Sequence, residues 1–388
     1  MGWIIFNIQP FFMKPYMNYL ISAISILLIL FGIEFNSSKN DSSNDIDSLT
    51  TIKLTFVGDL MCHTPQIEYA RISDDSLDFN PAFREVKPFL ENSDLTFGNF
   101  ETVVLGNGKK YSGYPNFNSP AEYLEALKKT GFDVLFTSNN HSMDQGKDGV
   151  ISTLEKIKSF GIIPIGTNTS QRERDSLRII NVKGIRIGLN SYSYGLNGRK
   201  LSSSNDFLVN IIDTTRIRKE ISKLISQKVD LVIICFHFGE EYSRSPSEFQ
   251  KEIVNKTFNY GADIIIASHP HVVQPVDFFY NPKARIKKGL IAYSLGNFFS
   301  NQQWRYSDAG LILNLEITKN NYKDSLWISK VSDIPTWVFK GDTKKGREYL
   351  IIPTDTSLAR KIQDFDSEKH LQKIIEAYDD THSLFRIQ

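Results

Sequence analysis

Six short apolar runs of this sequence each end in polar residues that can bind metal ions or move protons. The polar residues are, in chain order, Asp59, Asn99, Glu101, Asn140, His141, His237, His269, His271 and Asn297. Five of the seven histidines lie in or beside these clusters, His63 included. A random scatter would not concentrate histidine in this way, so the six segments are candidates for parts of one site.

The residue types at these positions are those that bind first-row divalent metal ions. Imidazole, carboxylate and amide oxygen suit Zn, Mn or Fe. His269 and His271 flank Pro270, whose fixed φ suits a rigid loop, and in an extended segment they would point the same way. Metal ions about 3.5–4 Å apart need carboxylates to offset their repulsion. The pattern therefore predicts a centre for one or two divalent ions, of the Mn, Zn, Fe or Mg kind.

Several of these residues also have a plainer interpretation. Asp59 could cap a helix and Glu101 could be a solvated loop acid. His63 could be a surface histidine rather than a ligand or its support, and Glu241 is expected in solvent. The residues predicted to support the ligands without binding metal are His63, Asn99, Asp144, Glu240 and Asn297.

The apolar runs before the clusters are typical of strands in an α/β protein. Strands are expected at 52–57, 94–97, 133–137, 179–182, 185–189, 230–236, 262–267, 290–294 and 311–317. Helices are expected at 81–92, 121–130, 147–160, 213–228, 246–260 and 367–378. In α/β sheets, ligands gather at the carboxyl ends of the strands, which is where the polar clusters fall.

The composition is that of a globular protein without a strong charge. The 388 residues carry 45 Lys and Arg against 44 Asp and Glu, a net charge of +1. Such a balance gives no general attraction to nucleic acid, so no nucleic-acid partner is expected. The two cysteines, Cys62 and Cys235, make no disulfide framework. Two buried free thiols are the favoured interpretation, with a disulfide bridge or metal ligation as alternatives.

The N-terminal segment is expected to anchor the chain in the cytoplasmic membrane. Residues 15–33 form an uncharged stretch of 19 residues, close to the roughly 20 that span a bilayer. No small-x-small cleavage site follows, which favours an uncleaved anchor over a cleaved signal peptide or a buried core helix. We expect an anchor or transmembrane helix at 1–35, a flexible linker at 36–50, an extracytoplasmic domain at 51–337 and a C-terminal helical appendage at 338–388.

The clusters, taken in order, resemble the motifs of the CapA family of poly-γ-glutamate capsule synthesis proteins. The motifs are GDLM at 58–61, GNFE at 98–101, SNNHSMDQG at 138–146, HFGEEY at 237–242, HPHVVQ at 269–274 and SLGNF at 294–298. The resemblance covers residues 54–299. That family is in turn similar to calcineurin-like metallophosphoesterases, which implies a four-layer αββα sandwich of two mixed sheets flanked by helices, with a two-metal site at one edge.

The resemblance also implies roles for individual residues. It gives one metal to Asp59 and His271, and the other to Asn140, His237 and His269. Glu101 falls where a bridging carboxylate belongs, and His141 where a catalytic histidine assists the leaving group. Two positions depart from the phosphoesterase pattern: His63 lies four residues after Asp59 instead of two, and the bridging position carries a longer Glu.

Two functions are consistent with these observations. One is a metal-dependent hydrolase, or a transferase, acting outside the membrane on a phosphoester or an envelope polymer. The other is a non-enzymatic subunit that binds an anionic polymer within a poly-γ-glutamate synthesis or export complex. In either case the expected partners are the membrane, capsule polymer synthase or export subunits, and an anionic polymer or phosphoester substrate. Fold and family do not choose between the two.

Overall fold

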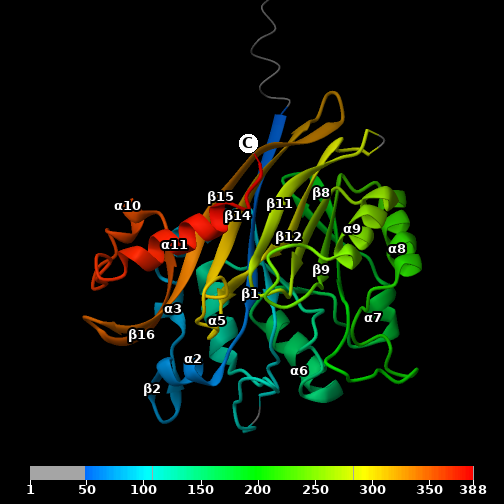
Figure 1. Ribbon diagram of the computed structural model, residues 1–388. Helices are drawn as coiled ribbons and strands as arrows, with labels where there is room; N and C mark the ends of the chain where they lie inside the picture. The colour runs from blue at the N-terminus through cyan, green and yellow to red at the C-terminus, as the bar shows by residue number, and fades with distance from the viewer. Residues whose placement is uncertain (1–48, 107, 283, 388) are drawn as a thin grey trace, which may run out of the picture. The chain divides into compact units, whose positions relative to one another are not determined.

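The computed structural model describes residues 49–387 except 107 and 283 (Figure 1). The expected anchor at 1–35 and the linker up to residue 48 therefore lie outside the described residues. Within the described part of the chain, no helix combines the length and the hydropathy needed to cross a membrane.

The larger of the two main sheets has eight strands and contains the first strand of the described chain near its middle. Its strands β1, β4, β5 and β6 run parallel to one another, and β14, β15 and β16 extend it with antiparallel strands. The order is β16 (Gly346–Pro353), β15 (Ser325–Thr343), β14 (Ala309–Asn320), β1 (Leu49–Leu60), β4 (Leu95–Phe100), β5 (Val134–Phe136) and β6 (Ile163–Ile165), with β13 (Asn297–Phe299) paired to β1.

The second sheet has six strands, of which the inner four are parallel and the two edges antiparallel. Its order is β11 (Val273–Tyr280), β12 (Lys288–Leu295), β10 (Ile264–Ser268), β9 (Leu231–His237), β8 (Ile185–Ser193) and β7 (Arg178–Val182). Because β9 and β10 are covered on both faces, nearly every residue in them is apolar, as the sequence indicated.

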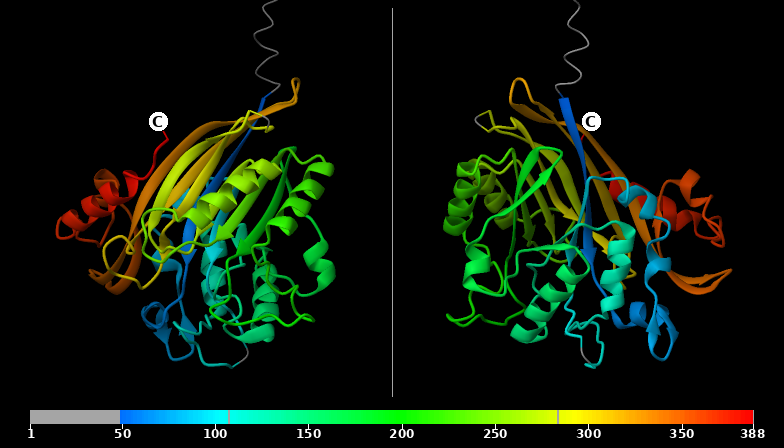
Figure 2. Two further views of the ribbon diagram at one scale, coloured as in Figure 1. Left: turned by 45° about the vertical axis from the view of Figure 1, so that its right-hand side comes forward. Right: turned by 180° about the vertical axis from the view of Figure 1, so that it is seen from behind.

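The two sheets pack face to face, and helices cover both outer faces (Figure 2). Alternate residues of the strands, such as Ile52, Leu54 and Phe56 of β1, form the core between the sheets with residues such as Ile233 of β9. α5 (Ala121–Thr130) and α6 (Gly146–Ser159) contribute to the core on the larger sheet, and α8 (Thr214–Ser226) and α9 (Glu248–Tyr260) to that on the smaller. The expected α/β architecture of four layers is therefore confirmed.

The helix expected at 81–92 is wrong in detail, because the chain forms two short helices there. They are α3 (Asn80–Phe83) and α4 (Lys87–Leu90), each with a proline in its first turn. Pro88 has no N–H to continue a helix through this point, so a new helix begins beside it. Four other short elements lie in the first half of the described chain: α2 (Thr64–Tyr69), β2 (Arg71–Ser73), β3 (Ser76–Leu77) and α7 (Gln171–Asp175).

The C-terminal segment differs from the expected helical appendage. The expected boundary at 337 falls inside β15, and the chain returns as β16 before α10 (Thr356–Ala359) and α11 (Leu371–His382) begin. The reason is alternation: Val338 packs under the helices of the larger sheet, whereas Trp337 and Phe339 face a separate core that includes Ile374 of α11. Beyond α11, Leu384 and Arg386 bond to Val276, so the chain end covers the edge of β11.

Candidate metal centre

The carboxyl ends of strands from both sheets converge on one buried cluster. β1 brings Asp59, β4 leads into Glu101, and β9 ends at His237. His269 and His271 follow directly after β10. All five side chains are buried, so the polar groups that face one another here are withdrawn from water.

Two glycines place the Asp59 carboxylate. A Cβ on Gly58 would lie 1.9 Å from the carbonyl oxygen of Gly296, which is closer than any side chain can approach. This close passage lets the Asp59 amide donate to the Gly296 carbonyl oxygen over 2.9 Å. Gly296 itself has a φ of +68°, a conformation that favours glycine. The strand β1 is thus held against the β12–β13 connection, with its aspartate aimed into the cluster.

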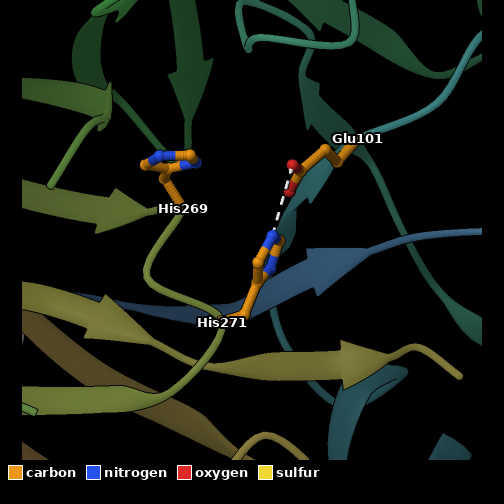
Figure 3. Close-up of side chains that lie close together, drawn as sticks. All are labelled: Glu101, His269 and His271. Carbon is orange, nitrogen blue, oxygen red and sulfur yellow. Dashed lines mark ion pairs between the residues drawn. The ribbon is translucent and has the colours of Figure 1, made fainter. Parts of the chain in front are cut away.

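The loop that carries the His-Pro-His sequence is strained. His269 and His271 have φ values of +104° and +58°, which residues with a Cβ adopt rarely. The two rings converge from the same loop, with centroids 6.0 Å apart, and Figure 3 shows both beside Glu101. The expectation of an extended segment here is therefore wrong: left-handed turns, rather than strand alternation, bring the imidazoles to one side. Such strain is typical of functional sites.

One half of the cluster centres on Asp59. Its Oδ2 lies 3.0 Å from Nδ1 of His271, and that nitrogen lies 3.2 Å from Oδ1 of Asn297. Asn99 donates from Nδ2 to Asp59 Oδ1 over 2.8 Å and to Glu101 Oε2 over 3.3 Å. The amide of Asn99 therefore holds the two carboxylates at a fixed separation.

The other half centres on His237. Its Nε2 lies 2.8 Å from Oδ1 of Asn140, and its ring centroid lies 4.7 Å from that of His269. Glu101 lies between the two halves, because its Oε1 is 3.5 Å from Nε2 of His237 and 3.8 Å from Nε2 of His271. This is the position that a bridging carboxylate would occupy.

The donor set fits divalent metal ions. Glu101 Oε1, His269 Nδ1 and Asn99 Oδ1 are buried without a hydrogen-bond partner, which is costly unless another group satisfies them. Two triplets each bring their ligand atoms within 4.8 Å of one another: Glu101 with His269 and His271, and Asp59 with Glu101 and His237. A cation in the triplet of Glu101, His269 and His271 would be a partner for both residues that have an unpaired atom, Glu101 and His269.

Burial sets the protonation of these groups. Burial and the charge of Asp59 raise the pKa of Glu101 well above its ordinary value. Burial and the neighbouring His269 lower the pKa of His237, and burial lowers the pKa of His269 to about 3. Both imidazoles are therefore neutral at pH 7, which is the form that binds metal, while Glu101 needs a nearby positive charge to ionise.

His141 lies at the edge of the cluster in a different setting. Its Nδ1 lies 2.7 Å from Oδ2 of Asp144, which also accepts the backbone N–H of Phe117 over 2.8 Å. The ring of Phe117 stands edge-on at 4.8 Å from the imidazole centroid. The other ring nitrogen, Nε2, lies 3.5 Å from Nδ2 of Asn197 beside a cavity of 620 Å³. A histidine oriented by a carboxylate and turned toward a cavity is suited to proton transfer.

Two of the residues expected near the ligands lie elsewhere. His63 is the N-cap of α2, where its backbone N–H donates to Gln66 Oε1 over 2.7 Å, and its ring packs against Phe117. Glu240 is exposed, and its neighbour Glu241, which is exposed as expected, lines the cavity beside His141. The other predicted site residues all take part in the hydrogen bonds and contacts described above.

β8 also contributes to the site, which the residue types along the sequence do not indicate. Tyr194 follows this strand and lies over His269, with ring centroids 4.6 Å apart. Asn197, on the same loop, accepts a hydrogen bond from Asn140 over 3.1 Å. β8 ends at the same sheet edge as β9, and that parallel arrangement was the available signal. Tyrosine is not among the usual ligands of these metals, so its residue type alone does not mark this position.

Residues 53–302 match the family described as "Bacterial capsule synthesis protein PGA_cap". The "Capsule biosynthesis protein CapA" of Bacillus anthracis is 32% identical over 271 residues, which is 67% of this chain and 63% of that protein. The chain thus spans slightly less than two thirds of that relative's length. The "PGA biosynthesis protein CapA" of Bacillus subtilis (strain 168) is 25% identical over 272 residues, which is 69% of this chain and 68% of that protein.

Solved structures resemble the chain more distantly. The calcineurin-like phosphoesterase YfkN from Bacillus subtilis has 12% identity and a TM-score of 0.44, over 86% of this chain and 98% of that chain.

Proposed function

The chain belongs to the bacterial capsule synthesis protein family PGA_cap, and we propose that it is a membrane-anchored member whose buried centre is a metal-dependent hydrolase of phosphoesters. The observation that carries this proposal is the Glu101 carboxylate. One of its oxygens is buried, has no hydrogen-bond partner and lies between His237 and His271. Burying a carboxylate oxygen without a partner lowers stability, and a bound cation would offset this cost.

The ligands would be the residues already grouped in the cluster. As the family resemblance implies, Asp59 and His271 would hold one ion, Asn140, His237 and His269 the other, and Glu101 both. The contacts of Asp59 with His271 and of Asn140 with His237 agree with this division, although the two close triplets divide the same residues differently. Bound at this position, divalent ions activate water and neutralise charge on a phosphoryl oxygen. Asn99 and Asn297 would fix the orientation of Asp59 and His271 through the hydrogen bonds described above.

His141 supplies the proton that the reaction needs. As the oxygen of a water forms its bond to phosphorus, the bond from phosphorus to the leaving oxygen breaks, and that oxygen takes the proton from Nε2 of His141. The attacking water gives up one proton to the solvent, and His141 regains one from the solvent before the next turnover. The products are an alcohol and phosphate, or a phosphomonoester when the substrate is a diester. Asp144 holds the Nδ1–H side of the ring and stabilises the protonated imidazole before transfer.

The place of the chain in the cell is also part of the proposal. The names of its relatives refer to capsule and PGA biosynthesis, which supports a role in making or exporting a poly-γ-glutamate capsule. The apolar segment within 1–35 would anchor it by a single span in the cell membrane, with the domain outside. Synthase or export subunits in the same membrane would be its partners.

A second candidate is a scaffold subunit that binds polymer without hydrolysing it. The biosynthetic names of the relatives favour it, since building a polymer does not require a hydrolase. The test is phosphate release from p-nitrophenyl phosphate by the full chain with Mn²⁺ or Zn²⁺, compared with a His141→Gln variant. Turnover that depends on both metal and His141 supports the hydrolase. A metal-loaded chain without turnover supports the scaffold.

A further inference from the structure

Four exposed aromatic side chains surround the metal centre, and we call Tyr114, Tyr194, Tyr242 and Trp304 the aromatic rim. Their exposed fractions are 71%, 41%, 44% and 51%. They come from four loops, which follow β4, β8, β9 and β13. Large aromatic side chains usually lose water contact on folding, so four exposed rings around one buried site point to a ligand that covers them.

Each ring is in contact with a histidine of the site or with another ring. Tyr194 lies over His269 at a centroid distance of 4.6 Å. Tyr242 lies 6.2 Å from His271, and Trp304 lies 5.3 Å from Tyr242. The ring of Tyr114, the rim residue that lines the cavity, lies 6.2 Å from His141. A group attached to a phosphoester at the metal centre would therefore meet the rim.

The position of Tyr242 is maintained against backbone strain. Its φ is +64°, which is rare for a bulky residue. Its amide donates to the Pro270 carbonyl oxygen over 2.7 Å, and its hydroxyl lies 3.4 Å from Nε2 of Gln302. Strain of this kind persists only where the surroundings impose it, and here it presents a ring to solvent next to the site.

The charges near the rim do not suit a polyanion. Among the described residues that line the cavity, Arg199 is the one lysine or arginine, and it already donates to Asn116 and to the Asp144 carbonyl oxygen. Glu241 lines the same cavity with the opposite charge. A chain of carboxylates would need a row of free cations along its path, as anionic polymers do in general.

Two further arginines near the site loops are occupied. Arg305 makes two hydrogen bonds to the Asp380 carboxylate, at 2.9 and 3.0 Å. Arg244 donates to the Asp380 carbonyl oxygen, and its guanidinium lies 4.3 Å from the ring centroid of Tyr306. Both side chains bind α11 instead of facing the cavity.

Amide side chains supply the polar contacts that the cavity offers. Asn116, Asn140 and Asn197 all line it. An amide donates and accepts hydrogen bonds at once, as does a hydroxyl group, and so it complements hydroxyls better than carboxylates. Aromatic faces beside amides, with little free charge, suit a ring that has apolar faces and a hydroxylated edge.

We propose that the aromatic rim binds a sugar ring, so that the substrate of this site is a glycosyl phosphate and not a polycarboxylate. The phosphoester part rests on the proposed function, whereas recognition of the sugar rests on the rim. The capsule polymer itself is then not the ligand of this site. Tyr242 and Trp304 are the specificity-determining residues that the structure makes most accessible to test.

The test uses the full chain loaded with Mn²⁺. Binding of N-acetylglucosamine 1-phosphate, AMP and a γ-linked glutamate pentamer is measured by calorimetry in the His141→Gln background, where turnover is blocked. We expect the sugar phosphate to bind most tightly, and Tyr242→Ala and Trp304→Ala each to weaken it about tenfold. Tyr242→Phe keeps the ring and should bind nearly normally, and Tyr322→Ala removes an exposed tyrosine outside the rim as a control.

The outcomes separate the two proposals. Tighter binding of AMP or of the glutamate pentamer, or ring removal without effect on binding, overturns the assignment of a sugar. In the wild-type background, phosphate release from N-acetylglucosamine 1-phosphate and from ethyl phosphate is also compared. If neither is hydrolysed but the sugar phosphate still binds in a rim-dependent way, the proposed hydrolysis fails and the inference about the rim stands.

Discussion

Glu101 and His269 show how the chemistry of single residues depends on burial. In water, a carboxylate and an imidazole would each be satisfied by solvent, whereas here an oxygen of one and a nitrogen of the other are buried without partners. Burial moves the pKa of Glu101 up and that of His269 down, so both are biased toward their neutral forms. A divalent ion would offset the cost of ionising the buried Glu101, and it binds the neutral form of His269. The two pKa shifts are therefore both consistent with a bound cation.

Asp144 gives the residue-scale prediction for catalysis. Asp144→Asn keeps the shape of the side chain but removes the charge that orients and stabilises the His141 imidazole. We expect turnover of a phosphoester to fall about 100-fold or more, with metal content unchanged. Activity and elemental analysis of the same preparation measure both effects, and the exposed Asp148→Asn is a matched control. Turnover equal to wild type would remove His141 and Asp144 from the mechanism.

The residues of the site were predictable where their types carry a chemical signal. Asp59, His237 and His271 stand out because each ends an apolar run with a metal-binding side chain. Tyr194 carries no such signal, and its role depends on the parallel pairing of β8 with β9. His63 was predicted to support the ligands because it is near Asp59 in sequence, but its backbone N–H donates to Gln66 at the start of α2 and its ring Nδ1 accepts the Asn301 N–H over 3.3 Å.

At the scale of elements, the close passage of β1 past Gly296 is the feature on which the site most depends. The Asp59 amide bonds to the Gly296 carbonyl oxygen because Gly58 has no side chain to separate the two chains. We expect Gly58→Ala to lower the free energy of unfolding by about 3 kcal/mol and to weaken metal binding, because the added methyl group must push the strands apart. Denaturant unfolding and metal titration measure the two effects.

Gly195→Ala is the control for this substitution, since a Cβ there meets no atom within 4 Å and the backbone is not in the left-handed region. It should leave the free energy of unfolding almost unchanged. Equal stability of the two variants would show that the strands separate without cost, and would contradict the rigid placement of Asp59.

Glu173 in α7 gives a prediction about pH. Burial alone would raise its pKa, but hydrogen bonds from Lys158 and Thr169 lower it to about 2. A carboxyl with a depressed pKa stabilises the fold above its unfolded pKa, and this contribution is lost as pH falls through the folded pKa. We expect Glu173→Gln to cost about 1 kcal/mol at pH 7, and the difference to shrink as the pH falls from about 4.5 toward 2.

Urea unfolding of wild type and Glu173→Gln at several pH values measures this difference, with the exposed Glu155→Gln of α6 as the control. A difference that grows below about pH 4.5 has the opposite sign and would rule out the proposed hydrogen bonds as its cause.

Elements were predicted well where local pattern and packing agree. The apolar runs of the sequence predicted β9 and β10, and α5 ends at Thr130 as expected, with Gly131 as its C-cap. Pro88 indicates that the expected helix at 81–92 is divided, although the spacing of the apolar residues favours a single helix. The left-handed turns at His269 and His271 were not readable, because tertiary contacts impose them on residues that disfavour them.

On the scale of the whole molecule, the C-terminal helix connects two loops that carry the aromatic rim. The Asp380 carboxylate of α11 binds Arg305, next to Trp304, and the Asp380 backbone carbonyl oxygen accepts a hydrogen bond from Arg244, close to Tyr242. The same helix packs on β14 and β15 through Ile374. A segment more than sixty residues away in sequence from Trp304 therefore helps to position it.

We expect Asp380→Asn to loosen the loop of Arg305 without unfolding the sheets, because the cores of the sheets do not involve this carboxylate. Hydrogen exchange should become faster for amides of 304–308 and stay unchanged in β9, in β10 and at 242–245, where Arg244 keeps its bond to the Asp380 carbonyl oxygen. Asp379→Asn, which changes an exposed neighbour on the same helix, is the matched control. Equal exchange in both variants would show that the Asp380 carboxylate does not restrain the loop of Arg305.

The C-terminal organisation was the least predictable part of the fold. β15 joins the larger sheet by antiparallel pairing with β14, and β16 by antiparallel pairing with β15, and the polar composition of the segment did not indicate this pairing. The sandwich itself followed from the alternation of strands and helices and from the family resemblance. The details at its edges depend on contacts between distant segments, which no local pattern specifies.

The central claim is that this cluster binds divalent metal, and elemental analysis of the purified full chain tests it most directly. We predict about one or two equivalents of Mn, Zn or Fe in the wild type and a clear loss of metal in His269→Ala. The control His382→Gln, which alters a histidine paired with Asp333 outside the site, should retain as much metal as the wild type. Wild-type protein that retains no metal after incubation with these ions and desalting, or a His269→Ala variant that retains as much as wild type, would contradict the account.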